Sequence, residues 1–170
     1  MAQNQTLLKE IWEKDPAVAG NVHYIGEYGV YPVWKNTEVT YYSLGEEMFA
    51  AMLEDLRKAE HYIFLEYFII QEGLMWDWIL EILEQKVKEG VDVRLIYDDV
   101  GCVSLLPFHY ADMMEKKGIK CLAFNRFVPV FSLVMNNRDH RKIMVIDGHT
   151  AYNGGINLAD EYINKKLRFG

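Results

Sequence analysis

The sequence predicts an α/β fold in which helices flank a largely parallel or mixed sheet. Three apolar, β-branched segments are typical of strands, and each follows a segment with helical periodicity. Two of these helical segments stop at a glycine, Gly90 and Gly118, directly before the next strand. This alternating order predicts helices packed on a sheet whose strands run largely in parallel.

The first forty residues are less regular than the rest. The segment QTLLKEIWEKD predicts a short amphipathic helix with four apolar residues on one side, namely Leu7, Leu8, Ile11 and Trp12. Residues 17–42 mix Gly, Tyr, Val and a proline, which indicates short strands or an extended segment. We therefore divide the chain into an irregular or helical covering segment, residues 1–40, and an α/β domain, residues 41–170.

A regular pattern begins at Ser43. Ser43 and Glu46 have the spacing of a capping box, and apolar residues then recur at helical intervals. The aromatic and β-branched run HYIFLEYFII, residues 61–70, predicts a buried strand. Its carboxylate, Glu66, needs a partner there. Glu66 either lines a site or pairs with an arginine such as Arg94.

Two further helix–strand pairs follow. The first helix has an apolar face from Trp76 to Val87 and stops at Gly90, before the strand VDVRLIYDD. The second helix runs through FHYADMMEKKG and precedes the strand IKCLAF. Asp98 and Asp99 end the middle strand, at the end of an open α/β sheet where ligands bind. They either cap the loop or hold Mg²⁺.

Composition limits the classes of function. The formal net charge of -7 argues against a nucleic-acid partner. The two cysteines, Cys102 and Cys121, form no CxxC and give no metal signature. No apolar run is long enough to span a bilayer and no signal peptide is visible, so we expect this chain to be soluble. The apolar residues 127–135 form either a buried covering segment or an exposed loop that touches a bilayer near the site.

The segment HRKIMVIDGHTAYNGGIN gathers the polar residues that carry chemistry. Side chains alternate between the faces of a strand, so His140 and Lys142 point the same way and Asp147 faces the other side. Asp147 and Gly148 form a strong hairpin-turn signal. This signal favours a turn and scaffold role for Asp147.

The length of that turn decides which residues return beside His140. In a two-residue loop His140 faces Gly155, and in a four-residue loop it faces Asn157. Either register returns Gly154, Gly155 and Asn157 beside His140 and Lys142. An imidazole, an ammonium, an amide and bare backbone N–H groups, without a carboxylate cluster for a metal, suit a phosphoryl group.

These residues resemble the phospholipase D superfamily. They match its signature HxKxxxxDxxxxxxGGxN at every fixed position. The flanking phrases GVDVRLIYDD, NNRDHRKIMVIDG and GGINLADEYIN are similar to bacterial cardiolipin synthases, and the resemblance covers about residues 28–167. It implies a phospholipase D-like half as the fold.

The resemblance also implies a mechanism without metal or cofactor. Two such motifs meet at one site, where one histidine attacks the phosphodiester to form a phosphohistidine and the other protonates the leaving alcohol. The catalytic residues that it implies are His140, Lys142 and Asp147. The phosphate-binding residues that it implies are Asn157, Gly155 and Gly154. Whether His140 is the nucleophile or the general acid is left open.

The chain contains one HxK motif, and no second one. The resemblance therefore implies the first catalytic half of a longer enzyme, cut before its second motif. The implied partners are phosphatidylglycerol, the second motif's domain of the same parent chain, and a membrane surface, with the parent enzyme at the bacterial cell membrane. The alternatives are a homodimeric phosphodiesterase or nuclease of the superfamily, and a non-catalytic α/β module.

Overall fold

The computed structural model describes residues 2–126 and 137–166. The apolar segment 127–135, for which two interpretations were left open, lies outside the described residues. The chain divides into two compact units, Met1–Tyr41 and Tyr42–Gly170, and each is described by itself. No helix in the described part of the chain is both long and apolar enough to cross a membrane.

The first unit contains two helices, α1 (Ala2–Lys14) and α2 (Pro16–Tyr28). The expectation of strands or extended structure is therefore wrong for residues 17–28. Asp15 explains the helix, because its carboxylate accepts hydrogen bonds from the backbone N–H groups of Ala17 and Val18. The next residue is a proline, which is favoured at the first helical position.

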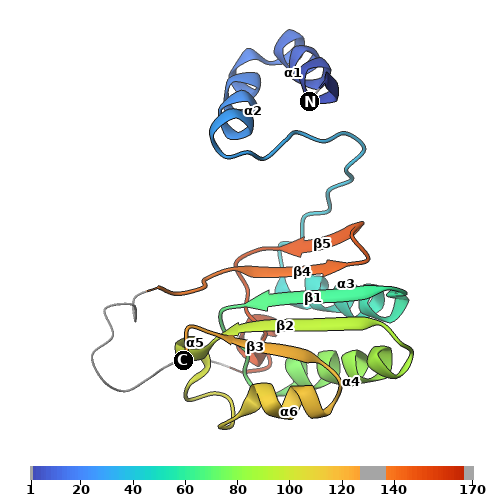
Figure 1. The fold of residues 1–170 in the computed structure, drawn as a ribbon, viewed down its shortest axis with the longest axis vertical. Coiled ribbons are helices and arrows are strands. Elements are labelled where there is room, and N and C mark those ends of the chain that lie inside the picture. Colours follow the sequence, from blue (N-terminus) through green and yellow to red (C-terminus); the bar gives the residue numbers. More distant parts are fainter. Residues whose placement is uncertain (1, 127–136, 167–170) are drawn as a thin grey trace. The chain divides into compact units, whose positions relative to one another are not determined.

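The second unit is built on a five-stranded mixed sheet (Figure 1). Its strands are β1 (Tyr62–Tyr67), β2 (Asp92–Asp98), β3 (Lys120–Phe124), β4 (Lys142–Ile146) and β5 (Thr150–Asn153). Their order is β3-β2-β1-β4-β5, with β1, β2 and β3 parallel, β4 antiparallel to β1, and β5 antiparallel to β4. The predicted α/β class, with a largely parallel or mixed sheet, is confirmed.

Helices precede or connect these strands, and a 3₁₀ turn follows the last of them. They are α3 (Gly45–Lys58), α4 (Leu74–Lys88), α5 (Asp99–Cys102), α6 (Tyr110–Lys116) and η1 (Asp160–Ile163). The capping box predicted at Ser43 does not form. The N-cap of α3 is Leu44, which makes no side-chain cap bond, and Glu46 instead accepts a hydrogen bond from Asn164 at 2.6 Å. A tertiary contact has replaced the local one.

The two faces of the sheet differ. Alternate residues of β1, β2 and β4 are buried and join the buried residues of α3, α4 and α6 in one hydrophobic core. The prediction of a wholly buried β1 is therefore wrong, because its other residues face the opposite side and are only half-buried. That side carries apolar groups which helices of the described chain do not bury, namely Tyr62, Phe64, Ile96, Leu122, Ile143 and Val145.

The β4–β5 hairpin has a register between the two that were predicted. Ile146 pairs with Thr150, so the loop has three residues, and extending the register places His140 opposite Ile156. Asp147 and Gly148 both adopt left-handed backbone conformations, with φ of 51° and 72°. Both predicted registers are wrong by one residue, because the loop contains His149 as well as Asp147 and Gly148.

Candidate active site

His140 and Lys142 lie where β4 begins. Because β4 runs antiparallel to β1, its first residue pairs with Tyr67 at the carboxyl end of β1. His140 precedes the strand and is exposed, whereas Lys142 is only 5 % exposed. The Lys142 Nζ donates a hydrogen bond of 2.6 Å to the backbone carbonyl oxygen of His140. The lysine side chain thus reaches back to the histidine's own backbone.

The ring of Phe68 contacts both residues. Its centroid lies 4.8 Å from that of the His140 imidazole and 5.2 Å from the Lys142 Nζ. The second distance is within the range of a cation–π contact. Phe68 therefore brings an imidazole and an ammonium together against one aromatic surface.

The electrostatics of Lys142 suit an anion. Burial lowers the pKa of its ammonium below the usual value, and the nearby Asp139 carboxylate partly opposes this shift. An ammonium has three N–H donors, and His140 accepts from one of them. Lys142 therefore retains donors for a ligand oxygen.

The imidazole of His140 is open to reaction. In residues 2–126 and 137–166, neither of its ring nitrogens has a hydrogen-bond partner. The ring of this exposed residue lies against that of Phe68. An imidazole in this state can act as a nucleophile or transfer a proton.

Asn157 is joined to the same part of the sheet. It is 3 % exposed, its Oδ1 accepts from the backbone N–H of Ile69 at 3.0 Å, and its Nδ2 donates to the Tyr162 hydroxyl at 2.9 Å. The residue is therefore next to the Phe68 segment, and one N–H of its amide is not used in these two bonds. This placement agrees with the expectation that Asn157 returns near His140.

Gly154 and Gly155 are exposed, and a Cβ built on either would meet no atom within 4 Å. Packing within the described chain therefore does not explain why these two positions are glycine. The open space leaves room for a ligand to approach their backbone, as the sequence predicts. Their contact with phosphate stays a prediction.

Asp147 lies at the other end of β4 from His140. Its carboxylate accepts hydrogen bonds of 2.8 Å from the backbone N–H groups of Glu60, His61 and Tyr62. Burial would raise the pKa of this carboxyl, but the three donors outweigh it and hold the pKa below its usual value. These contacts tie the hairpin turn to the start of β1. A part for Asp147 in the chemistry stays a prediction.

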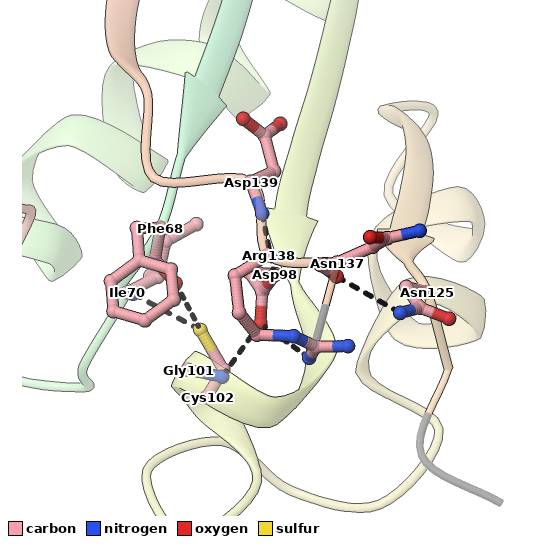
Figure 2. Close-up of polar contacts among 9 residues, drawn as sticks. All are labelled: Phe68, Ile70, Asp98, Gly101, Cys102, Asn125, Asn137, Arg138 and Asp139. Carbon is pink, nitrogen blue, oxygen red and sulfur yellow. Dashed lines mark hydrogen bonds and ion pairs between the residues drawn. The ribbon is translucent and has the colours of Figure 1, made fainter. Parts of the chain in front are cut away.

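Asp98 forms a polar cluster beside the site, which the sequence did not reveal (Figure 2). It is fully buried and accepts from Gly101 N at 2.9 Å, Arg138 Nη1 at 3.0 Å and Asp139 N at 2.9 Å. The described residues contain no group of three His, Cys, Asp or Glu side chains suited to a metal. Asp98 thus has the loop-capping role that was one of its two predicted alternatives. The partners Arg138 and Asp139 lie 40 and 41 residues further along the chain, so no local pattern signals them.

Glu66 also has a partner that the sequence did not identify. Its carboxylate accepts a hydrogen bond of 2.8 Å from Arg141, whereas the suggested partner Arg94 pairs with Asp92. Burial and a hydrogen bond with the Asp139 carboxyl raise the pKa of Glu66, and Arg141 opposes the shift. Glu66 therefore contacts the segment that carries His140.

A family model described as "Cardiolipin synthase, PLD-like domain" matches residues 52–167, more than half of the chain. The chain belongs to this family. The phospholipase D-like resemblance stated from the motif is thereby confirmed. The match includes β1 to β5 and every residue of the candidate site described above.

Two relatives illustrate the similarity of this phospholipase D-like domain. It is 52 % identical over 167 residues to an uncharacterized protein of Streptococcus mutans, covering 98 % of this chain and 36 % of that protein. It is 38 % identical over 135 residues to cardiolipin synthase 2 of Staphylococcus epidermidis, covering 79 % of this chain and 28 % of that protein. The chain thus spans about a third of the length of these relatives.

A solved structure shares the fold. The phospholipase D family member Nuc from Salmonella typhimurium aligns with a TM-score of 0.51 at 19 % identity, covering 69 % of this chain and 68 % of that one. At this identity the likeness shows the fold alone. It confirms that the mixed sheet with its flanking helices is a phospholipase D-like architecture.

Proposed function

We propose that this domain supplies one of two catalytic motifs of a cardiolipin synthase-type phosphatidyltransferase. The enzyme transfers a phosphatidyl group from one phosphatidylglycerol molecule to another and releases glycerol. The observation that carries the proposal is the exposed imidazole of His140 beside the buried ammonium of Lys142, in a chain of the cardiolipin synthase family.

The chemistry divides into two displacements at phosphorus. One histidine attacks the phosphorus of the first phosphatidylglycerol, the bond from phosphorus to the glycerol oxygen breaks, and a second histidine protonates that oxygen. The hydroxyl of the second phosphatidylglycerol then gives its proton to the second histidine and attacks the phosphohistidine. The phosphatidyl group leaves the first histidine, which is restored.

Lys142, Asn157 and the backbone of Gly154 and Gly155 bind the phosphate in this scheme. The lysine ammonium neutralises the charge that gathers on the non-bridging oxygens, and its partial burial strengthens the attraction. The free N–H of Asn157 and the open backbone of the two glycines add neutral donors. The phosphodiester of the substrate carries a single negative charge on its non-bridging oxygens, which the Lys142 ammonium can neutralise.

A second histidine must come from outside this chain. The described contacts of His140 include no general acid, and the sequence has no second HxK pair. We propose that the second motif belongs to the same, longer protein and meets the first at a membrane surface. This predicts that residues 1–170 alone release little or no glycerol from phosphatidylglycerol.

The test uses the longer protein proposed above, here called the intact protein, with phosphatidylglycerol in mixed micelles. Glycerol release and cardiolipin formation are measured for the wild type, His140→Ala and Lys142→Met. We expect losses of at least about a hundredfold in both variants. His149→Ala is the matched control, since His149 is an exposed histidine in the turn of the same hairpin, and it should retain activity. Full activity in His140→Ala would refute the proposal.

A second preparation, residues 1–170 alone, separates this function from the homodimeric phosphodiesterase. Residues 1–170 are assayed with bis(4-nitrophenyl) phosphate and their mass in solution is measured by sedimentation. Turnover by a dimer that is lost in His140→Ala would favour the phosphodiesterase. Absence of turnover in the isolated chain, with glycerol release by the intact protein, supports the transferase.

A further inference from the structure

We propose that Asp98, a residue outside the motif, positions His140 for reaction, and that Glu66 assists from the neighbouring strand. Both act through the residues on either side of the histidine, and in the part of the chain that the structure describes neither is hydrogen-bonded to its ring. The inference rests on the proposed function in one respect, because positioning affects turnover only if His140 reacts.

Asp98 fixes the backbone that leads into His140. It ends β2, and its carboxylate holds the guanidinium of Arg138 and the backbone N–H of Asp139 (Figure 2). These are the two residues directly before His140. Because the Asp98 side chain is fully buried, its charge has little water to solvate it, and loss of these donors would leave it unpaired. The approach to the histidine is therefore tied to the rigid end of a central strand.

Asp98 also reaches His140 by a second route, through Phe68. The same carboxylate caps α5 by accepting from Gly101 N. The next residue, Cys102, accepts from Ile70 N at 3.2 Å, and its thiol donates to the Phe68 carbonyl oxygen at 3.6 Å. Figure 2 shows Cys102 of α5 bonded to the Phe68 and Ile70 backbone. Helix α5 thereby holds the segment whose Phe68 ring lies against the His140 imidazole.

Glu66 fixes the backbone that follows His140 in the sequence. Its carboxylate accepts from the Arg141 guanidinium, and the Arg141 carbonyl oxygen accepts from Phe68 N at 3.1 Å. The Asp139 carboxylate joins the two sides, since it accepts from Arg141 N at 3.3 Å. His140 is therefore flanked on both sides by residues that β1 and β2 hold in place.

Holding the residues on both sides of His140 should affect the rate of the reaction. Transfer at phosphorus requires an attacking nitrogen to lie in line with the bond that breaks. A general acid must instead lie within hydrogen-bond reach of the leaving oxygen. A displacement of about 1 Å is enough to lower the rate about a hundredfold. We therefore expect Asp98→Asn to lower kcat about 10- to 100-fold, with KM changed less than about threefold.

Asp92→Asn is the matched control. Asp92 begins β2, where Asp98 ends it, and it also pairs with an arginine, at 2.7 Å from Arg94. We expect it to keep kcat within about twofold. A double-mutant cycle adds Arg138→Gln: since Asp98 and Arg138 act as one unit, the double variant should be about as slow as Asp98→Asn alone.

A spectroscopic measurement tests the positioning without relying on turnover. Protein labelled at histidine is studied by NMR, and the ring signals of His140 are assigned by their loss in His140→Asn. The Phe68 ring at 4.8 Å shifts these signals away from those of a free imidazole. In Asp98→Asn the shift should shrink, while the signals of His109 and His149 stay in place.

The kinetic and NMR results together show whether Asp98 positions His140 or only stabilises the fold. Normal kcat in Asp98→Asn with an unchanged His140 spectrum would show that Asp98 contributes only to stability and would overturn the proposal. If Asp98→Asn does not fold, Glu66→Gln replaces it, since Glu66 is about a quarter exposed, and the same loss of kcat and of the His140 shift is expected. If wild type and His140→Ala turn over equally, the proposed function fails, and the NMR result alone then decides the positioning.

Discussion

Replacing Asp147 separates a structural role from a catalytic one. Its carboxylate accepts three backbone hydrogen bonds of 2.8 Å. Bonds to a charged group contribute about 1.5–3 kcal/mol each when buried, and less in a partly exposed turn. We expect Asp147→Ala, which also places alanine at a φ of 51°, to lower the free energy of unfolding by about 2–4 kcal/mol. Asp147→Asn keeps one acceptor and tolerates this φ, so about 1–2 kcal/mol is expected.

Thermal unfolding followed by circular dichroism measures this effect. For a chain of this size about 1 kcal/mol corresponds to about 2–4 °C, so Asp147→Ala should lower Tm by about 4–16 °C. The folded-state pKa of Asp147 is depressed, so its stabilisation is complete above its unfolded pKa and is lost as the pH falls through the folded value. The gap between wild type and variant should therefore narrow below about pH 4.

Activity of the same variants completes the experiment. Assayed in the intact protein well below its Tm, Asp147→Asn should keep kcat within about threefold of wild type. A variant whose Tm lies within about 1 °C of the wild-type value, and which has nevertheless lost activity, would refute this reasoning. It would place Asp147 among the catalytic residues, as the family signature implies.

Three further outcomes are expected. The alkaline limb of the pH–rate profile should lie below the ordinary lysine pKa, because burial favours the neutral amine of Lys142, and a limb at or above that value would contradict the lowered pKa. Gly148→Ala should lower the unfolding free energy by about 1–2 kcal/mol, as measured in urea, because Gly148 has a φ of 72° and its new methyl group would meet the Tyr62 hydroxyl. Residues 1–170 should associate weakly through the open sheet face, where Leu122 is 56 % exposed, so their sedimentation coefficient should rise with concentration and rise less in Leu122→Lys. A strictly monomeric wild type would refute this last expectation.

The sequence predicted the α/β domain well because its signals are local. Apolar runs gave β1 and β2, and the glycines Gly90 and Gly118, with φ of 93° and 84°, end the helical segments before β2 and β3. The spacing of the motif likewise singled out His140 and Lys142, whose part in the chemistry stays a prediction. Patterns of this kind depend on residues that are close together in the sequence, so contacts formed later between distant residues do not alter what they predict.

One error came from a local signal that was misread, and the others came from contacts between distant residues. Helix α2 was missed because its aromatic and β-branched residues suggested strands, although Asp15 and Pro16 mark a helix start. The loop of the hairpin was counted wrongly because Asp147 is held by β1, 85 to 87 residues earlier in the chain. The bond from Asp98 to the segment before His140 spans 40 residues, and a sequence pattern carries no record of such a pair.

The mixed topology of the sheet explains why the candidate site forms where it does. In a wholly parallel sheet, ligands meet the carboxyl ends of strands, and the polar residues would follow each strand. Here His140 precedes its strand, and β4 enters antiparallel beside β1, so its first residue pairs with Tyr67. If β4 ran parallel to β1, its start would lie at the opposite end of the sheet from Asp98 and Phe68. The reversal of one hairpin therefore brings the motif to the end of β1 and β2, where their terminal residues can hold it.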